Sequence, residues 1–385
     1  MTAINGATVS ILVPCLNARR FLQERVQSLL TQTHGDWEAI VLDSGSTDGS
    51  WEFFESVAAS DHRFRLHQVP REGLYAALNR GLQMATGEFV HIATCDDTMD
   101  AAFLESCVKA LRLCPQAGVA ATNLMLINRR GESLSREDMI PYLPLESIND
   151  ILSLEVVRSY PIQDSPNYRR PPHDAILHFS GKSVYLSLTQ LVIRTEMARA
   201  TGAFDTTVGS IADVGWVARL TSLTGTVHLP HKLAQWRFHG SQLSVQNDPQ
   251  VALLWLNKLL ERAAADLYRR HRQLLSRNDR AVLMLPSKRY LALSQEAIKS
   301  CEREMFWRTV WMIIERPAST IRAIRNTGFR AVELRQSLIP MFMQRLKLVP
   351  EKLLDWGANM TSPESNQFSS AIDRPSGPDR SGYSQ

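Results

Sequence analysis

The sequence predicts an α/β protein built on a mixed, mostly parallel sheet flanked by helices, with an α-helical extension on its C-terminal side. Strand-like and helix-like segments alternate through roughly the first 130 residues. Polar residues stand directly after several of the strand-like segments. From about residue 251 the pattern becomes helical throughout, which sets this region apart.

Short apolar runs alternate with longer segments whose apolar residues recur every three or four positions. Such alternation indicates β-α-β units with parallel strands. The expected strands are residues 9–13, 37–42, 64–69, 89–93, 119–127, 186–193 and 227–229. The expected helices are residues 18–31, 51–59, 74–84, 101–113 and 213–223.

Three parts are expected along the chain: a globular domain of residues 1–245, a basic helical extension of residues 246–360 and a disordered tail of residues 361–385. Within the first part, residues 140–180 hold six prolines, and we expect them to pass over the functional edge of the sheet. Residues 251–360 contain 20 Lys/Arg against 10 Asp/Glu, a local surplus of +10. Because the whole chain carries only +4, the remainder is close to −6.

Composition restricts the class of protein. The 385 residues are 44% hydrophobic and 21% charged, which is ordinary for a globular protein. The first eight residues have no basic start, and no run reaches the roughly 18 apolar residues of a spanning helix, so we expect neither a signal peptide nor a membrane span and predict a cytoplasmic protein. The five cysteines form no CxxC pair, which indicates free thiols and argues against zinc. The sequence has no platform of basic and aromatic residues of the kind that binds nucleic acid.

Polar side chains follow three of the predicted strands. Asn17, Asp43 and Asp96 each come just after a strand end. Because parallel strands deliver their carboxyl ends to one edge of the sheet, where ligands bind, these residues are expected to converge there.

Asp96 and Asp97 are adjacent carboxylates at the end of the fourth strand. A hard divalent cation takes one or two such carboxylates together with substrate phosphates. The alternative is a helix cap with a favourable charge before the helix at residue 101. Both interpretations stay open on these residues alone.

The segment DSGSTDGS places Asp43 in a loop rich in turn residues. Its carboxylate could accept a hydrogen bond from a nucleobase N–H or a ribose hydroxyl, or it could form only an Asx-turn. No GK[ST] follows, so the loop is not a P-loop.

Seven segments together resemble one family. In order they are VSILVPCLN, VLDSGSTDGS, EGLYAALNRGLQMATGEF, TCDD, TGAFD, ADVGWVARL and WRFHGSQLS, spread over about residues 8–245. This set is similar to the inverting glycosyltransferases of family 2, which have the GT-A fold. The resemblance implies an enzyme that transfers a sugar from a nucleoside-diphosphate sugar to an acceptor hydroxyl. It also implies a place in the assembly of a bacterial polysaccharide or lipid-linked glycan.

The resemblance assigns roles to individual residues. Asp213 would be the catalytic base that deprotonates the acceptor, although a carboxylate there could also cap the helix that follows. Asp96 would hold Mg²⁺ or Mn²⁺, which neutralises charge on the leaving diphosphate. From the residues themselves we also expect Asp97 and His239 as ligands of this cation. The nucleotide-sugar site would comprise Pro14, Leu16, Asn17, Asp43, Ser46, Asn79, Arg80, Asp96 and Arg237.

Arg237 and His239 are two residues apart, so they would point the same way from an extended chain. Arginine suits diphosphate oxygens and neutral histidine can ligate a metal, so this segment is expected to close over the diphosphate. A structural histidine beside an exposed arginine is the alternative.

Two departures from the family pattern support a rival interpretation. Thr94 stands where the motif usually has its first acid, and Ala212 where an acid usually precedes the base. A catalytically weakened sugar-nucleotide-binding protein therefore stays open. A nucleotidyltransferase is disfavoured because no glycine-rich basic loop follows the first strand.

The basic helical extension admits two partners. Lys/Arg interleaved with aromatic residues can lie on an anionic membrane surface, at the inner face of the cell membrane. Alternatively the helices pack on the catalytic domain or on a second subunit, as a homo-oligomer.

Overall fold

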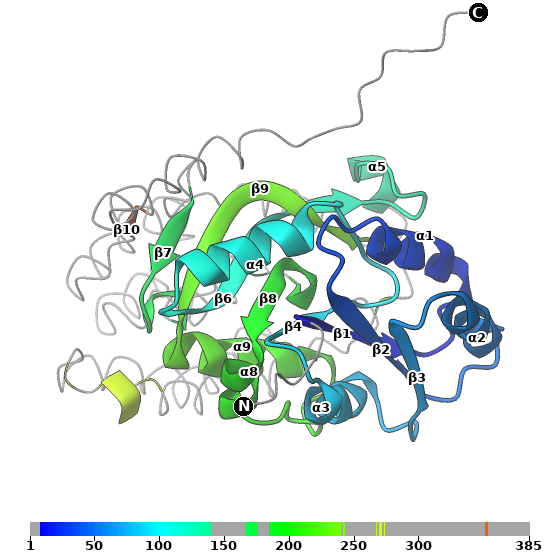
Figure 1. The fold of residues 1–385 in the computed structure, drawn as a ribbon, viewed down its shortest axis with the longest axis horizontal. Coiled ribbons are helices and arrows are strands. Elements are labelled where there is room, and N and C mark those ends of the chain that lie inside the picture. The colour runs from blue at the N-terminus through cyan, green and yellow to red at the C-terminus, as the bar shows by residue number, and fades with distance from the viewer. Residues whose placement is uncertain are drawn as a thin grey trace, which may run out of the picture.

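A mixed sheet of ten strands forms the centre of the protein in the computed structural model (Figure 1). The structure describes residues 8–139, 166–175, 185, 187–239, 242, 267, 269–271, 273 and 351–352. Most of the predicted basic helical extension, the whole predicted tail and most of the proline-rich segment lie outside these residues. Their boundaries stay predictions.

The strands run in the order β10-β7-β9-β6-β8-β4-β1-β2-β3, with β5 paired to β9. Strands β1 to β4, β8 and β10 span Val9–Cys15, Trp37–Asp43, Phe64–Gln68, Phe89–Ile92, Leu191–Arg194 and Glu351–Lys352. The remaining strands are β5 (Thr98–Met99), β6 (Ala117–Ile127), β7 (Asn167–Arg169) and β9 (Gly225–Arg237). Strands β4, β1, β2 and β3 are parallel to one another, whereas β8 runs antiparallel between β4 and β6. The predicted fold class, a mixed and mostly parallel sheet flanked by helices, is confirmed.

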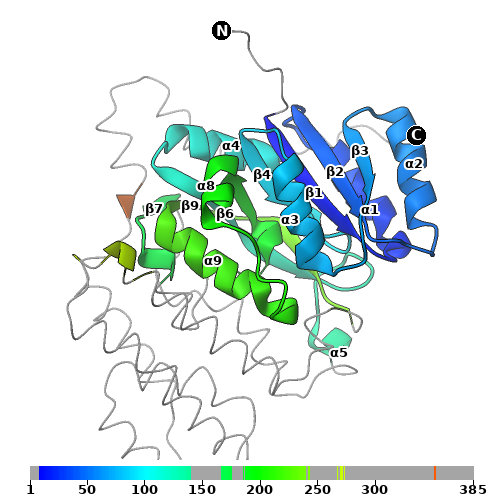
Figure 2. The same cartoon turned by 90° about the horizontal axis from the view of Figure 1, so that it is seen from below.

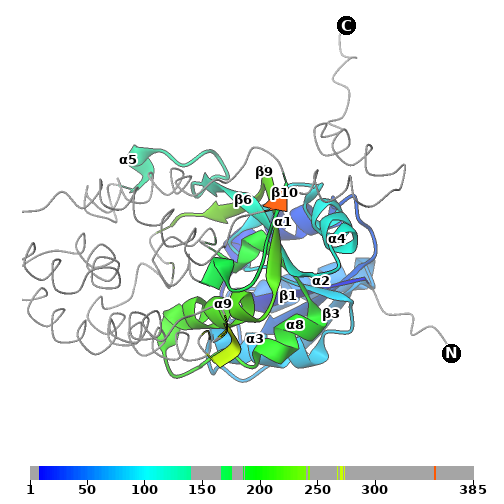
Figure 3. The same cartoon turned by 90° about the vertical axis from the view of Figure 1, so that its left-hand side faces the viewer.

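Helices cover both faces of this sheet (Figures 2 and 3). On one face lie α1 (Arg19–Leu30), α2 (Ser50–Ser60) and α4 (Phe103–Leu113), whose apolar residues share one core with β1 and β2. On the other face lie α3 (Leu74–Met84), α8 (Thr195–Thr201) and α9 (Ala212–Leu223), which share a second core. A short helix, α5 (Arg136–Met139), follows β6. Each core strand thus buries alternate side chains on opposite faces, as a doubly covered sheet requires.

Close packing of α3 on the sheet depends on Gly81. A Cβ atom there would stand 2.7 Å from Cδ1 of Leu42 and 3.1 Å from Leu12, so only glycine lets the helix approach this closely. The N-terminal turn of the same helix carries Tyr75.

Two predicted strands have other bounds in the structure. Within residues 186–193, a 3₁₀ turn over Leu188–Gln190 comes first and β8 begins only at Leu191, because Ser187 caps the turn and accepts the Thr189 N–H. The short strand predicted at residues 227–229 is part of the long β9. Pro230 interrupts the apolar run in the sequence, but the strand continues through it to Arg237.

Three further points complete the framework. None of the described helices is long and apolar enough to cross a membrane. Cys15, Cys95, Cys107 and Cys114 are free and buried, in agreement with the predicted free thiols. The helix predicted from residue 101 begins at Phe103 after Ala102, so Asp96 and Asp97 do not cap it.

Candidate active site

The candidate site lies where β4, β1 and β2 end side by side. The register pairs Cys15 with Asp43, and Leu12 with Ile92. Because the three strands are parallel, the loops that follow them leave from one edge. The predicted convergence of the loops carrying Asn17, Asp43 and Asp96 is therefore present in the structure.

The loop after β2 is organised by Asp43. Its Oδ1 accepts the backbone N–H groups of Gly45 and Ser46, both at 2.9 Å, which forms the Asx-type turn. Gly45 has φ +80°, a conformation that favours glycine. The carboxylate is only 1% exposed, and its Oδ2 has no hydrogen-bond partner among the described residues. A buried acceptor without a donor is costly, so this oxygen is suited to a ligand N–H or O–H.

The loop after β1 is tied to the same turn. The backbone N–H of Asn17 donates to Ser46 Oγ at 2.9 Å, and Asn17 Oδ1 accepts the Thr47 N–H at 2.8 Å. Asn17 holds φ +51°, one of the few conformations in which asparagine replaces glycine. Leu16 is 39% exposed at the rim, whereas Pro14 belongs to β1 and its carbonyl accepts the Cys95 thiol at 3.2 Å.

Pairing of β5 with β9 brings two distant parts of the sequence together. Thr98 lies opposite Gln235 and Met99 opposite Ala234. The segment of Asp96 and Asp97 therefore runs beside the segment of Arg237 and His239, about 140 residues later in the chain.

Asp96 and His239 form the more exposed pair of this junction. Their Oδ2 and Nε2 atoms are 3.0 Å apart, and 28% of the Asp96 side chain is exposed. Burial tends to raise the pKa of the Asp96 carboxyl, but the hydrogen bond and charge of His239 outweigh it and keep this pKa below its usual range. The ring of Phe21 packs on His239 with centroids 4.9 Å apart, which limits the ring's movement.

Asp97 is turned inward. It is 2% exposed, its Oδ1 accepts the Arg237 N–H at 2.9 Å and its Oδ2 accepts the Thr94 hydroxyl at 2.7 Å. Burial and the neighbouring Asp96 raise the pKa of Asp97 to about 7. Thr94, which stands in place of an acid, thus supports Asp97 with its hydroxyl.

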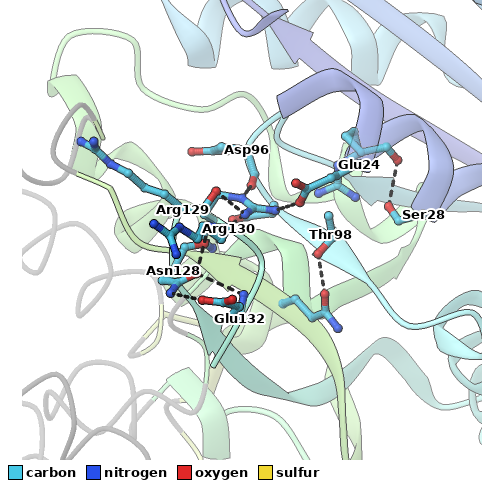
Figure 4. A network of polar contacts seen from close by, with 12 residues as sticks. Glu24, Ser28, Asp96, Thr98, Asn128, Arg129, Arg130 and Glu132 are labelled. Carbon is cyan, nitrogen blue, oxygen red and sulfur yellow. Dashed lines mark hydrogen bonds and ion pairs between the residues drawn. The ribbon is translucent and has the colours of Figure 1, made fainter. Parts of the chain in front are cut away.

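The Arg237 side chain is fully buried and links the Asp96 segment to its neighbours through hydrogen bonds. It donates to the Asp96 carbonyl at 2.7 Å, to the carbonyls of Asn128 and Arg129 at 3.0 and 3.1 Å, and to the carboxylate of Glu24. Figure 4 shows Asp96, Glu24 and the backbone at Asn128 converging on one point from three different elements. These contacts position Asp96, and the exposed arginine of the alternative interpretation is wrong.

Asp213 lies in the first turn of α9, which begins at Ala212 after Ile211, so Asp213 is not the helix cap. Its Oδ1 accepts the Val214 N–H at 2.8 Å. Burial raises the pKa of Asp213 to about 6, against the lowering effect of the Val214 N–H and of the Tyr75 hydroxyl. Tyr75 stands at the start of α3, which follows β3, so Asp213 belongs to the same edge of the sheet as the three loops.

Asn79 and Arg80 make other contacts than those predicted for them. The Asn79 amide donates to the Phe204 carbonyl at 3.0 Å and accepts the Phe204 N–H at 2.8 Å. Arg80 forms an ion pair with Glu72 at 2.5 Å on the surface. A contact of either side chain with a nucleotide-sugar stays a prediction.

The described residues contain no group of three or more His, Cys, Asp and Glu side chains that could hold a metal ion. Asp96 and His239 supply two, one carboxylate oxygen and one imidazole nitrogen. Both oxygens of Asp97 are already engaged with Arg237 and Thr94.

Sequence reasoning did not predict three contacts of this site. Arg25 is fully buried on α1, donates to the Thr94 carbonyl at 2.9 Å, and has both terminal nitrogens without partners among the described residues. Glu24 receives Arg237, and Tyr75 contacts Asp213. A charged residue within the apolar stripe of a helix was the one available signal for Arg25.

Known proteins share this fold and this N-terminal region. The family model "Glycosyl transferase family 2" matches residues 10–148. Among solved structures, Staphylococcus aureus TarS 1–349 in complex with UDP-GlcNAc superposes with a TM-score of 0.55 at 15% identity, covering 95% of this chain and 88% of that one. The same TarS fragment without ligand gives 0.53 at 13% identity, covering 80% of each chain. At such identities the likeness shows the fold alone.

Curated relatives match over shorter stretches. Glycosyltransferase GlyG of Streptococcus pneumoniae is 36% identical over 99 residues, which cover 26% of this chain and 33% of the relative. TuaG of Bacillus subtilis, described as a putative teichuronic acid biosynthesis glycosyltransferase, is 33% identical over 90 residues, covering 23% and 36%. The chain thus matches about a third of the length of these relatives. Residues 10–148, within a domain with the GT-A fold, thus match glycosyltransferase family 2.

Proposed function

We propose that the protein transfers a sugar from a nucleoside-diphosphate sugar to an acceptor hydroxyl, with inversion at the anomeric carbon. One observation supports this best. A half-buried carboxylate with a raised pKa, Asp213, lies at the same sheet edge as the buried free oxygen of Asp43 and the Asp96–His239 pair. Such a transfer needs a catalytic base for the acceptor hydroxyl, a hydrogen-bond acceptor for the nucleoside and a cation site beside the diphosphate.

In this proposal the donor lies across the ends of β1 and β2. Asp43 Oδ2 accepts an N–H of the base or a ribose hydroxyl, and the turn at Asn17 and Ser46 forms the wall beside it. Leu16, exposed at the rim, provides apolar surface for the nucleobase of the donor. Pro14 contributes indirectly, through the end of β1.

A divalent cation, Mg²⁺ or Mn²⁺, belongs beside Asp96 and His239. The donor set fits, since one carboxylate oxygen and one imidazole nitrogen face each other and the Asp96 side chain is partly exposed. Magnesium usually takes its remaining ligands from water and substrate phosphates. A cation here would neutralise charge that develops on the departing diphosphate. Asp97 and Arg237 hold Asp96 in place from the protein side.

Asp213 takes the proton of the acceptor hydroxyl. With a pKa of about 6 it is ionised near neutral pH and still basic enough to accept a proton. Attack by the acceptor oxygen from the side opposite the diphosphate forms the new glycosidic bond and inverts the anomeric configuration. One base and one displacement give inversion, whereas retention would need a second carboxylate as nucleophile.

The acceptor is proposed to be a glycan or a lipid-linked glycan in cell-surface polymer assembly, at the inner face of the membrane. The name of TuaG points to a cell-wall polymer for that relative, and the TarS complex holds UDP-GlcNAc. UDP-GlcNAc is therefore the first donor to test. Binding to anionic vesicles and to a second copy of the chain would involve residues outside the described part, and these proposals rest on the sequence alone.

The test is release of nucleotide from a panel of nucleoside-diphosphate sugars with Mn²⁺ or Mg²⁺, with and without acceptor extracts. Wild-type protein should release nucleotide, and Asp213→Asn should reduce transfer at least 1000-fold while binding nucleotide with wild-type affinity. Asp61→Asn, which removes a carboxylate from the far surface turn before β3, is the matched control. Nucleotide binding without turnover under every condition would leave the weakened binding protein as the correct interpretation.

A further inference from the structure

The first turn of α3 contacts the candidate base directly. Tyr75 is 7% exposed, and its hydroxyl donates to the Ser210 carbonyl at 2.8 Å. Ser210 is three residues before Asp213, and a hydrogen bond from the Tyr75 hydroxyl tends to lower the pKa of the Asp213 carboxyl. The Tyr75 hydroxyl therefore lies between the 3₁₀ turn Gly209–Ile211 and the first turn of α9.

A clamp around Phe204 fixes the Tyr75 ring. The Phe204 ring lies 5.3 Å from the Tyr75 ring and is stacked on Trp216 of α9 with centroids 4.4 Å apart. Asn79, one turn after Tyr75, holds the Phe204 backbone with two hydrogen bonds. Trp216 in turn donates to the Gly202 carbonyl at 2.8 Å. These contacts link α3 to α9 through one rigid loop, so the hydroxyl has little freedom to move away from Asp213.

Other charged groups on the surrounding elements are engaged elsewhere. Arg80 on α3 pairs with Glu72. Arg199 on α8 donates to the carbonyls of Leu82 and Ala85, and Arg219 on α9 to those of Thr201 and Ala203. Asp205 accepts the N–H and hydroxyl of Thr207. Among the described residues, Tyr75 is the one titratable side chain that affects the pKa of Asp213.

We propose that Tyr75 is a positioning residue for the base, whose hydroxyl holds the turn before α9 and orients the Asp213 carboxylate towards the acceptor. This inference rests on the proposed function. The single hydroxyl proton has two acceptors, the Ser210 carbonyl and the Asp213 carboxylate. It turns to the carboxylate while Asp213 is ionised, and to the carbonyl once Asp213 has taken the proton of the acceptor. The anion is thus stabilised before the reaction, and after it the protonated carboxyl can donate to the phenolic oxygen instead.

Tyr75→Phe tests this proposal because it keeps the ring contact with Phe204 and removes only the hydroxyl. We expect kcat to fall about 10-fold, since one oriented hydrogen bond to the base is lost. The acid limb of the kcat–pH profile should move upward by about half to one pH unit, because the ionised carboxylate loses a donor. The KM for the donor and the Kd for nucleoside diphosphate should stay at wild-type values.

Thr221→Val is the matched control. It removes a buried hydroxyl from α9 whose hydrogen bond goes to the Val217 carbonyl of the same helix. We expect an unchanged acid limb in this variant. If Tyr75→Phe leaves kcat and the acid limb as in wild type, or lowers kcat equally at all pH values, Tyr75 has no positioning role.

A second measurement separates this result from failure of the proposed function. Urea unfolding midpoints of wild type, Tyr75→Phe, Asp213→Asn and the double variant, from pH 4 to pH 8, report the coupling of the two side chains without any activity. Non-additive midpoints at pH 8 support the contact, and additive ones overturn it. Transfer that survives in Asp213→Asn would contradict the proposed base itself, whatever Tyr75 does. An inactive Asp213→Asn beside a wild-type-like Tyr75→Phe would overturn only the positioning role.

Discussion

Asp96 and Asp97 are neighbours in the chain, but their carboxylates face different surroundings. Both carboxylate oxygens of Asp97 accept hydrogen bonds from the protein, one from the Arg237 N–H and one from the Thr94 hydroxyl. Asp96 meets His239 at 3.0 Å with part of its side chain exposed. Asp97 therefore joins the segment after β4 to β9, whereas Asp96 keeps part of its side chain exposed.

This division predicts losses of different size from two similar substitutions. Asp97→Ala should lower the free energy of unfolding by about 1–3 kcal/mol at pH 5.5, where Asp97 is mostly protonated, because the buried Arg237 N–H loses its acceptor. Asp96→Ala should change it by less than about 1 kcal/mol. Urea unfolding at pH 5.5 measures both, with Arg112→Ala, an exposed ion-pair residue, as the control. Equal losses in the two aspartate variants would contradict the division.

His239→Gln should weaken Mn²⁺ binding without unfolding the protein. We expect the apparent Kd for Mn²⁺ in the presence of UDP to rise about 10- to 100-fold, the usual effect of losing one strong contact at a metal site. Electron paramagnetic resonance of free Mn²⁺ measures this without any turnover. His62→Gln, on an exposed turn, controls for the loss of a histidine. Unchanged Mn²⁺ binding in His239→Gln would remove His239 from the site.

Transfer should be lost as the pH falls through about 6. Burial raises the pKa of Asp213 to about 6, and only the ionised carboxylate accepts the proton of the acceptor. A kcat–pH profile at saturating donor and acceptor should therefore show an acid limb near this value. A rate that stays flat down to pH 4.5 would exclude Asp213 as the base.

The same raised pKa predicts a pH-dependent stability. Since the folded-state pKa exceeds the usual 3.8, the stability linked to Asp213 is present below about pH 4 and is lost as the pH rises through 6. At pH 8, Asp213→Asn should therefore have a free energy of unfolding about 1–3 kcal/mol higher than wild type. At pH 3.5 the two proteins should be equally stable. Asp61→Asn should instead have a lower free energy of unfolding than wild type at pH 8, because Arg63 lowers the pKa of Asp61.

Asp43→Asn should weaken nucleotide binding more than it weakens the fold. The substitution keeps an oxygen for the turn at Gly45 and Ser46, but it places an amide N–H where the free Oδ2 lies. We expect a Kd for UDP about 10- to 100-fold higher by calorimetry, as expected when a buried hydrogen bond is replaced by two opposed donors. Asp36→Asn on the surface should bind as wild type does, and similar affinity in both variants would contradict the assignment.

Local pattern predicted most of the fold. The helix expected over residues 74–84 has these same bounds, because its apolar residues follow a regular period and Gly73 precedes it. The pattern failed in β9, where residues 230–236 are mostly half-exposed and begin with a proline. There the strand is held by its partners β6 and β5, information that a local window does not contain.

The site was predictable in part. Strand ends indicated the edge at which Asn17, Asp43 and Asp96 meet. The different surroundings of Asp96 and Asp97 were not predictable, because they depend on Arg237 and His239 some 140 residues away. In the sequence, Thr94 stands where the family motif usually has an acid. In the structure its hydroxyl donates a hydrogen bond to Asp97.

Strand β9 joins the helix of Asp213 to the segment of His239 in one uninterrupted stretch of chain. The length of this strand therefore contributes to the distance between the proposed base and the proposed cation site. Removing one residue would turn every later side chain to the opposite face, and removing two would keep the faces but draw His239 back by about 7 Å. Changes in the length of this strand are thus a means of tuning the distance between these two sites while every reacting side chain stays the same.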